Sequence, residues 1–148
     1  MRRIIIDWSY PMDIDSIVYD ERMNDIGLYY ITRNFNGRIT DLYIGKTTYN
    51  FRSRLESHMK NWIDDYRGVI QVRLGYIVHP QNITVQYRKE LIDSAEKTLI
   101  YSMRNSLKHN KQCMRDCYPQ YWLDIHNTRY IGNLPPEFHF THEEWYGW

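Results

Sequence analysis

Between Gly27 and Gly45 the chain has the sequence GLYYITRNFNGRITDLYIG. The dipeptide Asn36-Gly37 stands between two runs rich in apolar, aromatic and β-branched residues. A tight two-residue hairpin turn requires a positive φ at both central positions, which Asn and Gly adopt more readily than other residues. This stretch therefore predicts two antiparallel strands, over about residues 27–33 and 39–45.

Further elements are predicted on both sides of this hairpin. Apolar residues at helical spacing predict one helix over residues 51–62, with Asn50 as its N-cap, and a longer one over about residues 88–108. The apolar positions are Phe51, Leu55, Met59 and Trp62 in the first helix and Leu91, Ala95, Leu99, Met103 and Leu107 in the second. Loose alternation predicts a third strand over residues 69–78, and a short strand is expected at residues 3–8.

This order of elements predicts an α+β fold, a small three-stranded antiparallel sheet flanked by helices. Residues 1–148 are expected to form a single domain, because the chain is too short for two ordinary ones. The core would span residues 26–110. Residues 1–25 would be an N-terminal extension with a short strand and an irregular segment, and residues 111–148 an aromatic-rich C-terminal extension of short irregular elements.

The distribution of charge limits the classes of function. Nineteen basic and 18 acidic side chains leave a formal net charge of +1, which excludes a uniformly basic nucleic-acid-binding chain and a disordered acidic one. The total conceals local excesses, because residues 27–62 hold six basic and two acidic side chains and residues 97–115 hold five basic and none acidic. Phosphodiester binding needs such a local excess of positive charge.

Neither a secretory nor a membrane-spanning segment is predicted. Only three apolar residues follow the charged N-terminus, where a secretory signal needs about 7–15, and no apolar run approaches the roughly 18 residues that span a membrane. Cys113 and Cys117 are four residues apart, so a disulfide between them would close a very short loop. These features predict a cytoplasmic protein with two reduced thiols and no membrane partner.

Polar groups stand at or beside the apolar faces of both predicted helices. Arg54 and His58 are four residues apart and project from one side of the first helix, at the border of its apolar stripe. They are either surface residues or a guanidinium and an imidazole directed into a groove beside the sheet. Glu96 lies on the core-facing arc of the long helix, so it is expected either to pair with a lysine or arginine or to bind a hard cation such as Mg²⁺.

Several of these residues follow one another along the chain in an order that resembles a known set of motifs. Gly27-Leu28-Tyr29 lies on one predicted strand and Tyr43-Ile44-Gly45 on the next, with Arg54-x-x-x-His58, Glu96 and Asn110 following along the chain. This series resembles the motifs of the GIY-YIG nuclease superfamily, with Leu28 in place of the usual isoleucine. The resemblance covers about residues 26–110 and includes Lys46, directly after the second tripeptide; Asn105 is the alternative to Asn110.

The resemblance implies a divalent-metal-dependent endonuclease that hydrolyses phosphodiester bonds, usually of DNA, of the restriction, repair or mobile-element type. Glu96 is then expected to bind one Mg²⁺ or Mn²⁺, and Arg54 to contact the phosphate. Tyr29 is expected to act as the general base while Tyr43 orients the water. His58 is either an alternative base or the acceptor of the tyrosine's proton.

These roles set requirements on the ionisation of the side chains. A tyrosine base needs a depressed pKa, which Arg54, Lys46 and a metal ion are expected to provide. His58 titrates near neutrality without any shift. Lys46 would also add positive charge at the phosphate, and Asn110 would hold the loop or the substrate backbone.

Two classes of function stay open beside the DNA endonuclease. The same scaffold could be a catalytically inactive nucleic-acid-binding or structural module, or a nuclease directed at RNA. The aromatic residues of the segment 118–148 are expected to pack in the core or in a homodimer surface, with stacking on unpaired bases as the alternative.

Overall fold

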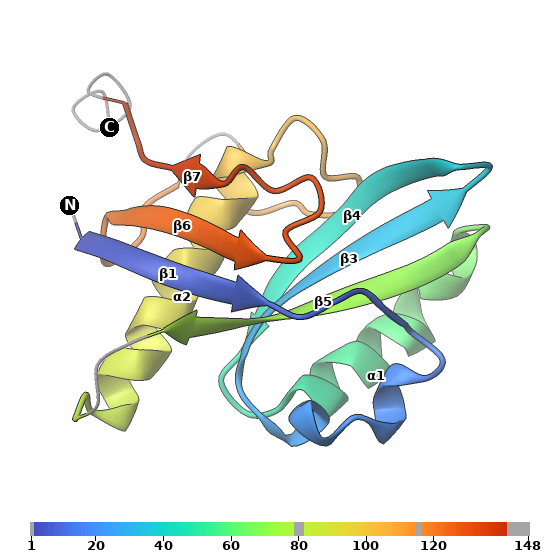
Figure 1. The fold of residues 1–148 in the computed structure, drawn as a ribbon, viewed down its shortest axis with the longest axis horizontal. Helices are drawn as coiled ribbons and strands as arrows, with labels where there is room; N and C mark the ends of the chain where they lie inside the picture. The colour runs from blue at the N-terminus through green and yellow to red at the C-terminus, as the bar shows by residue number, and fades with distance from the viewer. Residues whose placement is uncertain (1, 79–81, 115–116, 142–148) are drawn as a thin grey trace.

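A mixed, strongly curled sheet lies at the centre of the molecule, and two α-helices pack against it (Figure 1). The computed structural model describes residues 2–78, 82–114 and 117–141. Within these ranges the sheet has seven strands, six of them in the order β4-β3-β5-β1-β6-β7, with β2 paired to β5. The strands are β1 (Arg2–Trp8), β2 (Met12–Asp13), β3 (Gly27–Phe35), β4 (Arg38–Thr47), β5 (Val69–Val78), β6 (Leu123–Arg129) and β7 (Glu137–Phe138). The helices are α1 (Phe51–Asn61) and α2 (Val85–Ser102), with 3₁₀ helices at Ile17–Tyr19, Glu21–Asn24 and Ile63–Asp65.

The predicted fold class, a small three-stranded antiparallel sheet flanked by helices, is wrong. Strand β1 pairs antiparallel with β5 on one side and, from Arg2 to Trp8, parallel with β6 on the other. Strand β6 belongs to residues 111–148, for which the sequence predicts only short irregular elements. Arg2 pairs with Leu123, so the two strands come from opposite ends of the chain, and a local sequence pattern contains no information about such a partner.

The elements predicted from local patterns are present with shifted ends. Strands β3 and β4 pair antiparallel, and Asn36 and Gly37 between them have φ values of 52° and 74°. The Asn50 side chain caps α1 by accepting a hydrogen bond from the Ser53 N–H at 2.8 Å. Helix α2 starts before the predicted position because Thr84 caps it, and it ends at Ser102 instead of extending to residue 108.

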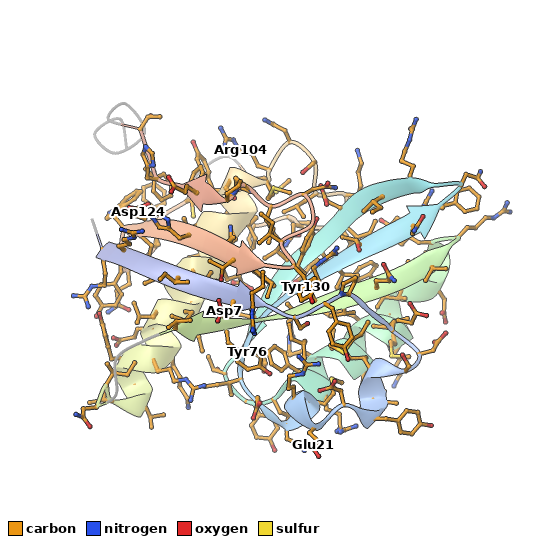
Figure 2. The ribbon with its side chains drawn as sticks, viewed as in Figure 1. Asp7, Glu21, Tyr76, Arg104, Asp124 and Tyr130 are labelled. Atoms are coloured by element: carbon orange, nitrogen blue, oxygen red, sulfur yellow. The ribbon has the colours of Figure 1, made fainter. Side chains whose placement is uncertain are left out.

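The ends of the parallel strand pair are joined by side-chain contacts. The indole of Trp8, 1% exposed, donates a hydrogen bond of 2.9 Å to the Asn127 side chain. Thr128 donates to the carboxylate of Asp7. Figure 2 shows Asp7 and Tyr130 close to the point where β1 and β6 both end, and the Tyr130 N–H donates to the Trp8 carbonyl at 3.4 Å. Strand β6 is thus an integral part of the sheet.

The two helices cover opposite faces of β3. Leu28 and Tyr30 pack in the hydrophobic cluster that contains the buried face of α2, whereas Tyr29 and Ile31 pack in the cluster that contains α1. Successive side chains of a strand point to opposite faces, so this division follows directly from the strand geometry. Because both faces are covered, the first six residues of β3 are buried.

A bulge and a docked loop shape the outer strand, β4. Ile31 pairs with Tyr43 but the next residue, Thr32, pairs with Asp41, so Leu42 is the extra residue of a β-bulge. The chain that follows α2 then runs along the free edge of β4, where the N–H groups of Lys108 and His109 donate to the carbonyls of Asp41 and Leu42 at 3.2 and 2.8 Å. This arrangement covers part of an otherwise open sheet edge.

Candidate functional site

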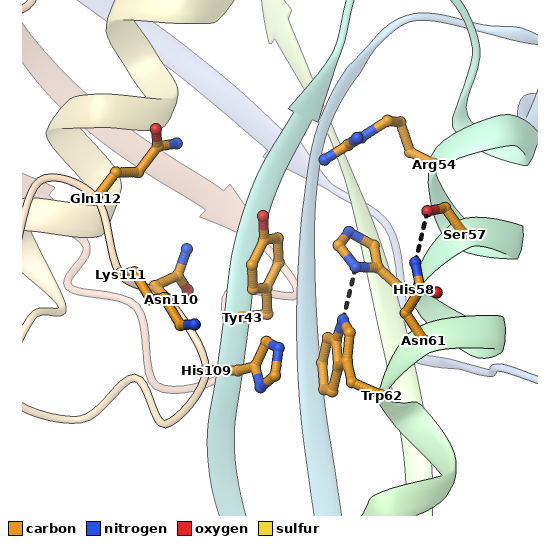
Figure 3. Close-up of a pocket in the computed structure, with 10 residues that line it drawn as sticks. All are labelled: Tyr43, Arg54, Ser57, His58, Asn61, Trp62, His109, Asn110, Lys111 and Gln112. Carbon is orange, nitrogen blue, oxygen red and sulfur yellow. Dashed lines mark hydrogen bonds between the residues drawn. The ribbon is translucent and has the colours of Figure 1, made fainter.

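A groove lies over β4, between α1 and the loop that follows α2 (Figure 3). It consists of two adjoining hollows, of about 480 and 570 Å³, which share Tyr43, Arg54 and Gln112. The first is also lined by Ser57, His58, Asn61, Trp62, His109, Asn110 and Lys111, and the second by Lys46, Thr47, Thr48, Tyr49, Asp93, Glu96 and Lys97. The structure therefore brings most of the residues singled out in the sequence to one surface.

The two tyrosines of the motifs lie at different depths. Tyr29 is fully buried and is not among the residues that line the groove, whereas Tyr43 lines both hollows. In Figure 3 the Tyr43 hydroxyl points to the part of the groove where Arg54 and Gln112 face each other. The expected assignment of Tyr29 as general base and Tyr43 as water-orienting group therefore fits the placement of these side chains poorly.

Gly45 explains how the Tyr29 ring fits under the groove. Tyr29 and Gly45 are cross-strand partners, and a Cβ atom at position 45 would overlap the Tyr29 hydroxyl and come within 2.7 Å of the Tyr43 ring. Contacts that short are not tolerated, so a glycine is required here by the close approach of two aromatic side chains. The glycine of Tyr43-Ile44-Gly45 thus has a packing role.

Both tyrosines are phenols in the free protein. Burial raises the pKa of Tyr29 and of Tyr43 above the usual value, and the effect of Arg54, which acts in the opposite direction, is smaller. Arg54 by itself therefore does not depress the pKa of either tyrosine, and the predicted depression would depend on the metal ion. Desolvation penalises the phenolate more than the single guanidinium stabilises it.

His58 is held between two partners on the α1 side of the sheet. Its Nε2 lies 2.7 Å from the Tyr29 hydroxyl, and its Nδ1 accepts a hydrogen bond of 2.7 Å from the indole of Trp62. Burial, with further contributions from Arg54 and His109, lowers the pKa of His58 to about 4. The imidazole is consequently neutral at neutral pH, and the prediction that it titrates near neutrality is wrong.

Glu96 reaches the second hollow from α2 and is 5% exposed. Its carboxylate accepts a hydrogen bond of 3.2 Å from Gln112. The nearest lysines are engaged elsewhere, because the ammonium groups of Lys46 and Lys97 lie 2.8 and 3.2 Å from the carboxylate of Asp93. Burial raises the pKa of Glu96 to about 7, although Lys46 and Arg54 oppose the shift.

These properties bear on the predicted metal ion. The described residues contain no group of three or more His, Cys, Asp or Glu side chains that could hold a metal. A buried carboxylate whose positive neighbours do not compensate for its desolvation nevertheless suits a hard cation. Mg²⁺ keeps several waters and needs one or two carboxylates together with substrate phosphate, so Glu96 fits as a single protein ligand.

Asn110 and Lys46, both predicted to bind substrate, have other partners in the structure. The Asn110 amide accepts from the Ile44 N–H at 2.9 Å and donates to the Ile44 carbonyl at 2.8 Å. Both ends of this side chain are thus used to dock the loop on the edge of β4. Lys46 lines the second hollow, but its charge is partly balanced by Asp93.

Some residues of the groove were not identified from the sequence. Trp62 was predicted only as part of an apolar stripe, yet its indole contacts His58 and its ring stacks on His109, with centroids 4.0 Å apart. Gln112 carries no sequence signal and is found only because the loop returns it to Glu96. Trp62 follows His58 by one helical turn, and this spacing is the sequence signal that could have identified Trp62 as a groove residue.

Comparisons with protein-family models, with curated proteins and with solved structures give no match. The geometry of the groove is accordingly the basis for assigning a function.

No helix in the described ranges combines the length and apolar character needed to cross a membrane.

Proposed function

We propose that the protein is a divalent-metal-dependent endonuclease that hydrolyses phosphodiester bonds, with DNA as the favoured substrate. The observation that carries this proposal is the arrangement of Tyr43, Arg54 and Glu96, which reach one groove from β4, α1 and α2. Strand β4 and helix α1 follow one another in the sequence, whereas α2 comes much later, and the groove contains a phenol, a guanidinium and a buried carboxylate. The sequence resemblance to GIY-YIG nucleases names the same residues.

Positive side chains around the groove support an anionic substrate. Arg54 lies at the junction of the two hollows, where its planar guanidinium could bind two non-bridging oxygens of a phosphodiester. Lys111 lines one hollow, and Lys46 and Lys97 line the other. A nucleic-acid strand that follows the groove would pass all four positive charges.

Glu96 would hold the Mg²⁺ or Mn²⁺ ion. When bound, such an ion supplies positive charge for the phosphoryl and leaving oxygens. Since the pKa of Glu96 is about 7, the carboxyl retains its proton in part at neutral pH, and the negative form becomes dominant only above that value. Metal binding and deprotonation of Glu96 are therefore expected to be linked.

Tyr43 is proposed as the group that accepts the proton of the attacking water, in place of Tyr29. Of Tyr29 and Tyr43, only Tyr43 lines the groove, and its hydroxyl lies on the side of Arg54. Tyr29 lies beneath the groove, with its ring stacked on that of Tyr43 and its hydroxyl 2.7 Å from Nε2 of His58, so these two residues would support Tyr43 from the α1 side. A phenol with a raised pKa is a weak acid, so substrate and metal must favour its ionisation before it can act as a base.

The test is cleavage by the purified protein of plasmid DNA, single-stranded DNA and RNA, each with Mg²⁺, with Mn²⁺ and with EDTA. Metal-dependent cutting is expected, and Glu96→Gln and Arg54→Gln are each expected to reduce the rate by more than about 100-fold. Glu90→Gln is the matched control, because Glu90 is a carboxylate on the same helix that contacts Gln86 and Tyr121 outside the groove.

Full activity of Glu96→Gln would contradict the proposal. Salt-sensitive binding without any cutting would identify a nucleic-acid-binding module instead, and cutting confined to RNA would replace DNA as the substrate.

A further inference from the structure

We infer that Trp62 is a positioning residue that fixes the tautomer of His58, so that the imidazole donates a hydrogen bond to Tyr29 and does not accept the tyrosine's proton. The tautomer follows from contacts within the protein. Its effect on catalysis rests on the proposed endonuclease function.

The first step concerns the contact between Trp62 and His58. The indole Nε1 of Trp62 lies 2.7 Å from Nδ1 of His58, as the dashed line in Figure 3 shows. An indole N–H can only donate a hydrogen bond, so Nδ1 must be the nitrogen that carries no proton. Trp62 and His58 are 7% and 8% exposed, and water therefore has little access to replace this contact.

The second step concerns the other ring nitrogen. A neutral imidazole carries one N–H, and with Nδ1 unprotonated this proton is on Nε2. Nε2 lies 2.7 Å from the Tyr29 hydroxyl oxygen. The Tyr29 oxygen is thus the acceptor, and His58 in this state has no free lone pair with which to take a proton from Tyr29.

The third step follows the hydrogen bonds toward the groove. The Tyr29 oxygen accepts from Nε2–H of His58, and the positive charge of nearby Arg54 opposes the rise in the Tyr29 pKa. Its own proton must then point away from His58. Tyr43 is the neighbour on the groove side, because its ring is stacked on the Tyr29 ring with centroids 6.0 Å apart.

The two hydrogen bonds run in one direction, from Trp62 to His58 and from His58 to Tyr29, and Tyr43 comes next because its ring is stacked on the Tyr29 ring. Trp62 sets this direction, because its indole N–H can donate a hydrogen bond but cannot accept one. Tyr43 stands at the end of this series, in the groove, where a donated hydrogen bond would favour its phenolate. Trp62 therefore acts on the proposed base through two intervening side chains.

Nitrogen NMR of the full-length ¹⁵N-labelled protein tests the tautomer without any variant. The expected spectrum has His58 Nδ1 in the unprotonated range and Nε2 in the protonated range at neutral pH. A protonated Nδ1 in the wild-type protein would overturn the inference. This measurement is independent of nuclease activity, so it can fail or succeed whatever the outcome of the cleavage assay.

Trp62→Phe tests whether Trp62 is the cause. Phenylalanine keeps an aromatic ring but has no N–H, so the protonated nitrogen of His58 is expected to change from Nε2 to Nδ1, with a loss in kcat of about 10-fold and little change in KM. The control is Tyr66→Phe, since Tyr66 packs edge-on against Trp62 with centroids 5.7 Å apart and does not line the groove. An Nε2–H tautomer that persists in Trp62→Phe would overturn the role of Trp62, even if kcat falls.

Discussion

Tyr29 and Tyr30 are neighbours on β3, yet they belong to two different regions of the molecule. Both are fully buried, and burial raises the pKa of both hydroxyls. Tyr30 faces α2 and donates to the carboxylate of Asp41, which also accepts a hydrogen bond from Asn133 at 3.2 Å. Tyr29 faces α1 and meets the imidazole of His58.

The hydroxyls of Tyr29 and Tyr30 differ in their hydrogen-bond partners, since both residues are equally buried. A carboxylate acceptor gives the Tyr30 proton a permanent position, so this hydroxyl serves only the packing of that face. The partners of Tyr29 are donors, which leaves its proton directed to a third group. Buried tyrosines with similar pKa shifts thus have different functions according to whether their partners donate or accept.

Removal of each hydroxyl separates the two regions and gives the largest expected difference between them. Tyr29→Phe is expected to lower kcat by about 10- to 100-fold, because it removes the hydroxyl that accepts from His58 beside Tyr43. Tyr30→Phe is expected to leave kcat unchanged and to lower the free energy of unfolding by about 1–3 kcal/mol, because Asp41 loses a buried donor. Cleavage kinetics and urea unfolding of both variants measure this. Equal losses of activity would remove the distinction between the two faces.

The buried carboxylates of Asp41 and Glu96 differ in the same way as the two tyrosines, namely in their hydrogen-bond partners. Asp41 accepts from Tyr30 and Asn133, whereas Glu96 accepts from Gln112, and burial raises its pKa from 4.5 to about 7. The folded state therefore binds a proton that the unfolded state releases between these values. Its contribution to stability is complete below pH 4.5 and is lost as the pH rises through about 7.

Glu96→Gln is consequently expected to stabilise the protein at pH 8, by on the order of 2 kcal/mol, while it abolishes metal-dependent cleavage. At pH 4.5 the variant and the wild type are expected to unfold at similar urea concentrations. The measurement is urea unfolding at both pH values, with Glu90→Gln as the control for the loss of a carboxylate on α2. If the variant is destabilised equally at both pH values, folding does not raise the pKa of Glu96, and the expectation is wrong.

A smaller effect is expected at the loop that docks on β4. Asn110→Ala removes both hydrogen bonds to Ile44 and is expected to lower the free energy of unfolding by about 1–2 kcal/mol. Asn105→Ala, at an exposed position, is expected to change it by less than about 0.5 kcal/mol. Thermal unfolding of the two variants gives the comparison, and a larger loss in Asn105→Ala would reverse the assignment of the motif asparagine.

Local patterns alone determined several parts of this protein. The Asn36-Gly37 turn, the cap at Asn50 and the apolar stripe of α1 predict elements that are present, because each depends on backbone angles or on contacts within one helical turn. The same reasoning placed Arg54 and His58 on one side of a helix, and it singled out Glu96 from its position on a core-facing arc. Residue type and spacing were sufficient for these statements.

Other features were decided only by the tertiary structure. The parallel pairing of β1 with β6 joins the two ends of the chain, and the bulge at Leu42 depends on the register with β3. The choice between Asn110 and Asn105, and the partners of Glu96, depend on where the loop after α2 returns. The pKa values moved against expectation, up for Tyr29 and down for His58, because desolvation depends on everything packed around a group. Local secondary structure depends on neighbouring residues, so the sequence predicts it. Burial and the direction of a hydrogen bond depend on contacts between distant segments, so only the tertiary structure determines them.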